Sequence, residues 1–379
     1  MGRLFLLLAL ASCSGARRPQ APGTGRAAPR WIRANLHAHA GDRTPFIGDD
    51  GYLSPAALHK SLQAAGVQLS VHTPHSTRNR EGDVARAFER QAIHERRFPG
   101  AVLGEELTVA SGPNHRNWKR LAGVQVPGNL NHLGLVGIRR FVPDGTPLDQ
   151  ACDAAHGDGG VCIVFHPGPG PLMWEPGLWE RPGHRERIDA LEVYNGLALT
   201  SAGLHFEQRY RDAIAYSGLG IHVAAVAGAD VHGPDEPART RKRLGVLAML
   251  PLQSIGNGLG ERAAITLAAA RDSRLAAVLD AVRARRTVAT FGLADLALEC
   301  ADLGQVRHTG VVDLRLRLGR PVGRVRLWRE GKAWREWSHV REVHFRDRIV
   351  QPTSYSFSIE DGAGRAQTSG IWYEPPSGG

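Results

Sequence analysis

The chain alternates short apolar runs with amphipathic stretches from about residue 31 to residue 290. The apolar runs, which predict strands, cover residues 31–36, 67–71, 101–108, 130–138, 161–165, 190–194 and 221–227. The amphipathic stretches, which predict helices, cover residues 55–65, 83–97, 148–156, 206–217 and 274–285. Strands that alternate with helices are typical of a parallel sheet built from βαβ units, and this number of units favours a barrel.

The pattern changes at about residue 293. Residues 311–318 and 355–359 alternate apolar with polar positions, which is the period of a strand with one face exposed. Residues 324–337 predict a β-hairpin whose turn is Glu330-Gly331-Lys332. We therefore predict a small antiparallel β-sandwich domain over residues 293–379. Three tryptophans are expected to pack in its own core: Trp328, Trp334 and Trp337.

Residues 1–13 have the pattern of an export signal. An apolar run at residues 4–10 follows Arg3 and is too short to cross a bilayer. Leu10-Ala11-Ser12-Cys13 is similar to a bacterial lipobox, where a lipoprotein signal peptide is cut before the cysteine and the Cys13 thiol is acylated. An ordinary secretory signal is the alternative. Residues 14–30, rich in Pro, Gly, Ala and Arg, predict a flexible linker.

These features predict an exported bacterial lipoprotein that is anchored to a membrane and faces the periplasm or the cell surface. The net charge of +10 favours a small anionic substrate or an anionic membrane face. A nucleic-acid partner is not favoured, because the basic residues are scattered and aromatic residues make up only 6% of the chain. The oligomeric state is left open. Buried thiols are the default expectation for Cys152 and Cys162, and a bridge between them in an oxidising compartment is the alternative.

Two pairs of polar residues stand at predicted strand ends. His37-Ala38-His39 ends the first strand, and Asp230-Val231-His232 ends a late one. Residues i and i+2 of a strand point to the same side, so each pair directs two side chains at one point. If both strands belong to one barrel, both pairs lie at its C-terminal rim, where barrel enzymes keep their active sites.

Other imidazoles and carboxylates fall near further strand ends: His75, Glu105, Glu106, His132, His166, and the loop acids Asp42, Asp49 and Asp50. A single histidine in such a place is more often structural, but the repetition along the chain is not expected by chance. Imidazole and carboxylate ligands suit zinc, manganese or iron, and bridging carboxylates offset the repulsion between neighbouring cations. We therefore predict a site for two or three divalent metal ions.

The motifs that carry these residues, in this order, resemble the polymerase-and-histidinol-phosphatase (PHP) superfamily. They are Asn35-Leu36-His37-Ala38-His39, Asp50-Gly51 with Leu53-Ser54-Pro55, Thr73-Pro74-His75-Ser76, Gly104-Glu105-Glu106-Leu107-Thr108, His132-Leu133-Gly134-Leu135, Phe165-His166-Pro167, Leu191-Glu192-Val193-Tyr194-Asn195 and Gly228-Ala229-Asp230-Val231-His232. The resemblance implies a distorted (β/α)7 TIM-like barrel over residues 31–290. It implies these metal ligands: His37, His39, Asp50, His75, Glu106, His132, His166, Asp230 and His232.

Two details refine the resemblance. Pro74 stands where the family usually has an Asp, which removes an acidic partner of the ligands. The C-terminal β domain resembles the branch of the superfamily that contains bacterial carbaryl hydrolase.

The function implied is that of a metal-dependent hydrolase, of the phosphoesterase type, that uses a metal-bound hydroxide in a di- or trinuclear site. The same site acting on a carbamate, ester or amide is the first alternative, and an inactive surface binding scaffold is the second. His72 and His115 are the candidates for an acid–base group beside the metals.

Overall fold

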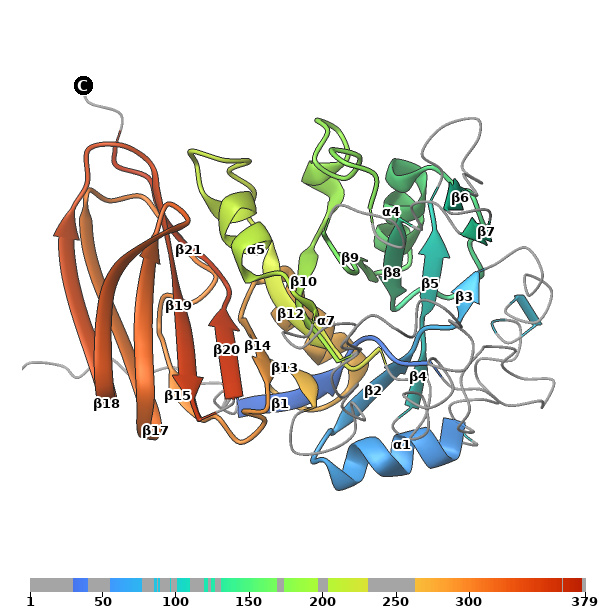
Figure 1. The fold of residues 1–379 in the computed structure, drawn as a ribbon, viewed down its shortest axis with the longest axis horizontal. Helices are drawn as coiled ribbons and strands as arrows, with labels where there is room; N and C mark the ends of the chain where they lie inside the picture. The colour runs from blue at the N-terminus through green and yellow to red at the C-terminus, as the bar shows by residue number, and fades with distance from the viewer. Residues whose placement is uncertain are drawn as a thin grey trace, which may run out of the picture.

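The computed structural model describes residues 30–39, 55–76, 85, 86, 88, 96, 101–109, 119–121, 124–126, 131–168, 174–196, 204–230, 263–362 and 364–376. Cys13, Asp50, His115, His232 and most of the helix expected at residues 83–97 lie outside these ranges. The described part has a mixed α/β fold, shown in Figure 1. Within that part, no helix is both long enough and apolar enough to span a bilayer.

The first part of the chain forms short strands. They are β1 (Arg30–Asn35), β2 (Leu69–His72), β3 (His75–Ser76), β4 (Ala101–Leu103), β5 (Glu105–Thr108), β8 (His132–Val136), β9 (Val161–Val164), β10 (Ala190–Asn195), β12 (Ala224–Gly228), β13 (Ala264–Ala270) and β14 (Thr287–Phe291). The helices are α1 (Pro55–Ala64), α4 (Leu148–Gly157), α5 (Glu207–Ile214) and α7 (Leu275–Arg283), with a 3-10 turn at Arg185–Arg187. Three short elements complete this part: β6 (Lys119–Leu121), β7 (Val124–Val126) and β11 (Leu204–His205).

The expectation of a wholly parallel sheet is wrong. Parallel pairs join β1 to β2, β2 to β4, β3 to β5, β9 to β10 and β10 to β12. Antiparallel pairs join β5 to β8, β8 to β9, β1 to β13 and β13 to β14. A helix between two strands permits a parallel crossover but does not require one, since α4 and α7 each connect antiparallel neighbours.

Two contacts bring the sheets of this part together. Gly104 separates β4, which pairs with β2, from β5, which pairs with β8. A Cβ atom at Gly104 would lie 2.8 Å from a Val71 methyl and 3.0 Å from the Leu135 carbonyl oxygen, so this crossing requires a glycine. At the other end, the Thr266 hydroxyl on β13 bonds both the amide and the carbonyl of Ala227 on β12 at 2.9 Å. Over the described residues, these strand orders and directions do not confirm the distorted (β/α)7 barrel that the resemblance implies.

Apolar side chains fill both faces of these short strands. Every residue of β2, β8, β9 and β12 is buried, as expected of strands covered on both sides. Cys152 on α4 and Cys162 on β9 form a disulfide with a Cα–Cα distance of 5.3 Å, and this bond attaches the helix to the strand behind it. Within the described ranges, Cys300 is a free cysteine.

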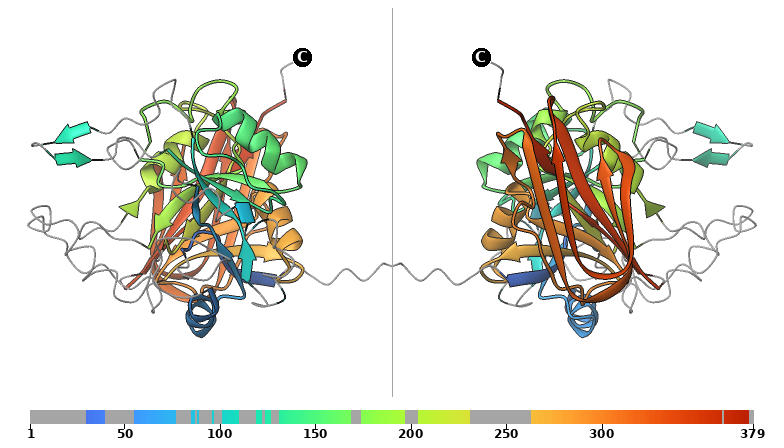
Figure 2. Two further views of the ribbon diagram at one scale, coloured as in Figure 1. Left: turned by 90° about the vertical axis from the view of Figure 1, so that its right-hand side faces the viewer. Right: turned by 90° about the vertical axis from the view of Figure 1, so that its left-hand side faces the viewer.

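The C-terminal part is a strongly curved sheet of long strands, seen face-on in the right panel of Figure 2. Its strands are β15 (Leu298–Glu299), β16 (Val306–Arg307), β17 (Val311–Arg329), β18 (Lys332–Arg348), β19 (Thr353–Asp361), β20 (Gly364–Thr368) and β21 (Ile371–Tyr373). All pairs but β16–β21 are antiparallel. Because β20 also pairs with β14, this sheet continues the sheet of the first part, and the predicted β-sandwich is not confirmed.

The predicted hairpin is confirmed. Arg329 pairs with Lys332, and Glu330 and Gly331 both have positive φ angles, 50° and 70°, as a two-residue type I′ turn requires. The expectation that all three tryptophans pack in the core is wrong for Trp334, which is 48% exposed.

Candidate metal centre

Seven of the predicted ligands lie in the described part, and strand ends bring six of them together. His37 and His39 follow β1, His166 follows β9, Asp230 follows β12, and His75 begins β3. His132 is the first residue of β8, yet it reaches the same place because β8 runs antiparallel to β5 and β9. Its register partner is Thr108, the last residue of β5. The seventh residue, Glu106, comes from inside β5.

Glu106 is the common neighbour of these histidines, and it is 1% exposed. Its Oε2 atom lies 3.4 Å from His37 Nε2, 3.0 Å from His39 Nε2 and 3.0 Å from His75 Nδ1. Its Oε1 atom lies 2.5 Å from His132 Nδ1 and 3.5 Å from His166 Nε2. One buried carboxylate therefore faces five imidazoles.

Asp230 supplies the second carboxylate of this cluster. Its Oδ1 atom lies 3.3 Å from His37 Nε2 and 3.1 Å from His39 Nε2, and its Oδ2 atom lies 3.6 Å from His166 Nε2. The Asp230 amide donates to the His37 carbonyl at 2.8 Å, which fixes the end of β12 against the end of β1.

Three overlapping groups within this cluster could each hold a divalent ion, with their ligand atoms within 4.8 Å of one another. They are His37, His166 and Asp230; His37, His39 and Glu106; and His75, Glu106 and His132. His37 belongs to two groups and Glu106 to two, so neighbouring cations would share a ligand. Sharing of this kind is what places two or three ions side by side.

The residues fit a metal by two tests. A tetrahedral ion with nitrogen and oxygen ligands at about 2.1 Å holds those ligand atoms roughly 3.4 Å apart, and the contacts above fall around that value. In addition, neither buried oxygen of Glu106 accepts a hydrogen bond of ordinary geometry from the described residues, despite the five ring nitrogens around it. The donor set of imidazole and carboxylate suits zinc, manganese or iron.

A second layer of polar residues orients the first. Glu192 Oε1 lies 2.9 Å from His37 Nδ1, and Glu192 Oε2 accepts the His166 amide at 3.0 Å. The Asn195 amide group donates to Glu192 Oε2 at 3.0 Å and to Asp230 Oδ2 at 3.1 Å. Partners that hold the far nitrogen of a ligating histidine fix its tautomer and ring orientation.

The motif that contains Glu192 and Asn195 is visible in the sequence, but the role of these two residues is not. On a regular strand, residues three apart point to opposite faces. A register shift between Glu192 and Tyr194 in the β10–β12 pairing breaks that rule, and this bulge turns Asn195 to the side of Glu192. The available signal was a charged residue inside the otherwise apolar strand Ala190–Asn195, where Glu192 is fully buried.

Unusual backbone conformations also occur at this site. Asn131, His166 and Asp230 have positive φ angles of 47°, 46° and 45°, a region that non-glycine residues seldom adopt. All three adjoin or belong to the cluster, at the start of β8 and the ends of β9 and β12. Hydrogen bonds from the His166 and Asp230 amides hold two of these sharp turns. Strained backbone of this kind clusters at functional sites.

Close packing leaves little freedom to the first histidine. The His37 ring stacks on Phe165 with centroids 3.8 Å apart and an interplanar angle of 3°. Gly228 lies behind it, and a Cβ atom there would be 2.3 Å from His37 Cβ and 2.8 Å from Glu192 Oε1. The glycine of this motif therefore allows the end of β12 to approach β1.

The electrostatics of the cluster depend on its carboxylates. Burial alone would lower the pKa of His37, but the nearby carboxylates of Asp230, Glu106 and Glu192 raise it to about 10. Burial lowers the pKa of His132 to about 4, and Glu106 offsets only part of that effect. Despite burial, the surrounding histidines hold the pKa of Glu106 well below its usual range. The anionic centre thus needs positive charge, from protons on imidazoles or from bound cations.

The remaining candidate site residues fall into those that the structure places and those that lie outside the described residues. Glu105, the neighbour of Glu106, turns to the other side of β5 and accepts the Val142 amide at 3.0 Å, so the choice of Glu106 over Glu105 agrees with the strand geometry. His72 is fully buried at the end of β2. Asp50, His232 and His115 lie outside the described residues, so their roles stay predictions, as does the acid–base role of His72.

Comparison with known proteins gives structural likeness alone. No family model matches the chain, and no curated protein matches it. Among solved structures, the chain is similar to a two-domain protein containing a predicted PHP-like metal-dependent phosphoesterase from Bacteroides vulgatus, at 16% identity and a TM-score of 0.44. That alignment covers 91% of this chain and 95% of the other.

Two further structures match about half of the chain. An amidohydrolase from Chromobacterium violaceum, with bound sulfate and no metal, is 16% identical over 54% of this chain and 88% of its own, with a TM-score of 0.35. A protein from Bifidobacterium adolescentis named as a metal-dependent phosphoesterase is 14% identical over 54% of this chain and 89% of its own, with a TM-score of 0.33. These structures include the class that the motifs resemble, but at such identities the functional argument rests on the site.

Proposed function

We propose that this protein is a metal-dependent hydrolase of the PHP type, and that it acts on phosphoesters. One observation carries the proposal: a buried carboxylate, Glu106, faces five imidazoles from four different parts of the chain, with Asp230 opposite. A purely structural role would not require so many titratable groups in one place, because each costs free energy to bury.

Divalent ions held by this cluster would activate a water as nucleophile and take up negative charge on the substrate oxygens. The protein's own residues supply the frame for that chemistry. Glu192 holds the His37 ring by its Nδ1 atom, which leaves Nε2 directed at Glu106 and Asp230. Asn195 fixes the Asp230 carboxylate in the same way. No side chain of the chain is needed as a covalent nucleophile.

The choice of a phosphoester rests on the family resemblance and on the net charge of +10, which favours anionic substrates. The second candidate keeps the metals and changes the bond to a carbamate, ester or amide. It is supported by the softer resemblance of the C-terminal part to the carbaryl hydrolase branch. The two differ in the charge of the substrate and not in the ligand set.

The test compares substrates on one metal-loaded sample. We would measure kcat/KM for p-nitrophenyl phosphate, its diester and an aryl carbamate, with wild type and His37→Ala. Phosphoester turnover that disappears in His37→Ala and after chelation is the expected result. Carbamate turnover alone would replace the phosphoesterase by the second candidate. Bound metal with no turnover of any substrate would leave the third reading, an inactive binding scaffold.

We also propose that the mature protein is a lipoprotein attached through Cys13 and exposed outside the cytoplasm. The disulfide between Cys152 and Cys162 supports this location, since such bonds persist in oxidising compartments. Radiolabelled palmitate should be incorporated into the wild-type protein and not into Cys13→Ser. Export of the protein is a separate test of whether the residues before Cys13 act as a signal. Equal labelling of the two would exclude Cys13 as the acylated residue.

A further inference from the structure

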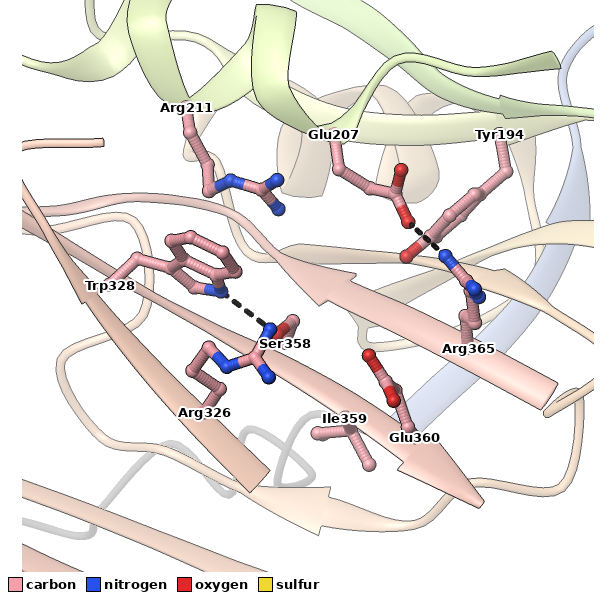
Figure 3. Close-up of a pocket in the computed structure, with 9 residues that line it drawn as sticks. All are labelled: Tyr194, Glu207, Arg211, Arg326, Trp328, Ser358, Ile359, Glu360 and Arg365. Carbon is pink, nitrogen blue, oxygen red and sulfur yellow. Dashed lines mark hydrogen bonds and ion pairs between the residues drawn. The ribbon is translucent and has the colours of Figure 1, made fainter. Parts of the chain in front are cut away.

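A second polar pocket lies at the junction between the first part of the chain and the C-terminal sheet, shown in Figure 3. Its lining comes from β10, α5, β17, β19 and β20: Tyr194, Glu207, Arg211, Arg326, Trp328, Ser358, Ile359, Glu360 and Arg365. Its volume is about 110 Å³. A single water needs roughly 10–15 Å³ in this measure, so the pocket has room for a small polyatomic ligand.

Arg211 on α5 is the unusual residue of this pocket. It is 8% exposed, and neither its Nη1 nor its Nη2 meets an acid: they donate to the side-chain oxygens of Gln367 at 3.1 Å and Gln208 at 3.2 Å. Its Nε–H is buried and has no hydrogen-bond partner among the described residues. Buried cations are normally paired with an acid, because burial without a counter-charge is costly.

The other charged lining residues do have partners of opposite charge. The pairs are Glu207 with Arg365 at 3.5 Å, Glu360 with Arg324 at 3.5 Å, and Arg326 with Glu336 at 2.6 Å. Within the part of the chain that the structure describes, no carboxylate lies within 4.0 Å of Arg211, so it is the charged lining residue without an ion pair at that distance.

An aromatic ring holds two guanidinium groups in place. The Arg211 guanidinium carbon lies 3.8 Å from the centre of the Trp328 ring, and that of Arg326 lies 5.3 Å from it. The Trp328 indole donates to Ser358 Oγ at 2.8 Å, which fixes the ring (Figure 3). Stacking on an aromatic ring satisfies the face of a guanidinium and leaves its in-plane N–H groups for an anion.

We propose that this pocket binds a small oxyanion, such as a carboxylate or a sulfate- or phosphate-like group, through Arg211 and Arg326 on the Trp328 ring. Guanidinium groups bind such anions through parallel hydrogen bonds, and the ligand would supply a direct ion-pair partner for Arg211. The ligand would also connect α5 to β17, and therefore link the two parts of the molecule. This site does not depend on the proposed hydrolase activity.

The two sites are neighbours through β10. Tyr194 lines the oxyanion pocket, and the next residue, Asn195, bonds Glu192 and Asp230 in the metal centre. The test must therefore separate anion binding here from anion binding at the histidine cluster. Asp230→Asn alters the cluster only, while Arg211→Lys and Arg326→Gln alter the pocket only.

The experiment is calorimetric titration of the purified protein with sodium sulfate and, separately, sodium acetate. Arg329→Gln is the matched control, because Arg329 lies on the same strand, has the same 24% side-chain exposure as Arg326, and also stacks on a tryptophan. We expect at least one anion to bind, with Kd raised about tenfold or more in Arg326→Gln and Arg211→Lys and unchanged in Arg329→Gln and Asp230→Asn.

Three outcomes would overturn the proposal. The first is no binding of either anion at millimolar concentration. The second is binding that Asp230→Asn abolishes and the pocket variants do not, which would assign it to the histidine cluster. The third is an equal effect of Arg326→Gln and Arg329→Gln, which would show a general effect of surface charge. Arg326→Gln keeps the test informative even if Arg211→Lys fails to fold.

Discussion

The two parts of this molecule place their charged residues in opposite ways. In the first part, short strands are buried on both faces, and charged groups gather in one buried cluster where they compensate one another, as Glu106 and His37 do. In the C-terminal sheet, the long strand β17 alternates buried and exposed positions, and its charges face solvent. Asp313, for example, meets Arg346 across the strands at 3.1 Å. Buried charge in the first part is therefore expected to be functional, and exposed charge in the second to be nearly neutral for stability.

The largest effect is expected from Glu106→Gln. This change removes the charge that faces five imidazoles, so kcat/KM of the metal-loaded enzyme should fall at least 100-fold, which corresponds to about 2.7 kcal/mol. Glu105→Gln is the matched control, because Glu105 is an adjacent, equally buried acid that bonds the Val142 amide instead. Steady-state kinetics on both variants would check this. Comparable losses in the two would mean that burial, and not the cluster, decides the effect.

The next effect concerns the layer behind the ligands. Glu192→Gln should weaken metal affinity roughly 10- to 100-fold, because it loosens the rings of His37 and His166 without removing a ligand. Asp189→Asn is the control at the opposite end of β10, where Asp189 accepts the Cys162 amide at 2.8 Å. Competition with a chromogenic chelator measures the affinities. If Glu192→Gln bound metal as tightly as Asp189→Asn does, Glu192 would have no role in the site.

The disulfide in the first part should contribute to stability. Its residues are 10 apart in sequence. Closing a loop of that size restricts the unfolded chain and raises the free energy of unfolding by about 3 kcal/mol. Urea unfolding with and without a reductant should show this loss in the wild type. The double variant Cys152→Ala with Cys162→Ala should be less stable and insensitive to the reductant, while Cys300→Ala should behave as wild type. Equal stability of the wild type with and without the reductant would contradict the disulfide.

In the C-terminal sheet, the hairpin turn should matter more than any surface charge. Gly331→Ala forces a side chain into a positive φ of 70°, and we expect a loss of about 1 kcal/mol in the free energy of unfolding. Gly157→Ala is the control, since Gly157 ends α4 and a Cβ atom there would meet nothing within 4 Å. Chemical denaturation of both variants decides the matter. A stable Gly331→Ala would mean that the turn relaxes.

The smallest effect is expected from Asp313→Asn, the counterpart of Asp230 in the exposed sheet. A hydrogen bond from His344, with a further contribution from Arg346, lowers the pKa of Asp313. A lowered folded pKa gives stability that is present above the ordinary pKa of Asp, near 4, and is lost as the pH falls through the folded value. Unfolding curves of the variant and the wild type should nearly coincide at pH 7, and the small remaining difference should shrink as the pH falls below the ordinary pKa of Asp. A large difference at pH 7 would break the contrast between the two parts.

The sequence predicted the strand positions better than their directions. Apolar runs at residues 31–36, 161–165 and 190–194 became β1, β9 and β10 almost unchanged. β13 was not predicted because Ala264–Ala270 consists largely of alanine, which favours helices and has a low propensity for strands. Pairing direction depends on contacts between residues distant in sequence. For that reason the antiparallel pairs on both sides of β8 could not be predicted from the sequence.

The candidate site was predictable where a candidate ligand follows a strand, as with His37, His166 and Asp230. The roles of Glu192 and Asn195 depend on a β-bulge that no local sequence pattern predicts. The oxyanion pocket was not predictable at all, since Arg211 and Trp328 meet only when α5 packs against β17. Local periodicity thus indicates which residues end a strand, and tertiary packing decides which of them meet.

The central claim is that this cluster holds more than one divalent ion, with Glu106 shared between them. The most direct test is to titrate metal-free protein with zinc or manganese and count the ions bound per chain by elemental analysis after gel filtration. We predict two or three ions in the wild type and in Glu105→Gln, and fewer in Glu106→Gln. One ion or none in the wild type, or equal counts in both glutamate variants, would contradict a shared, multinuclear site.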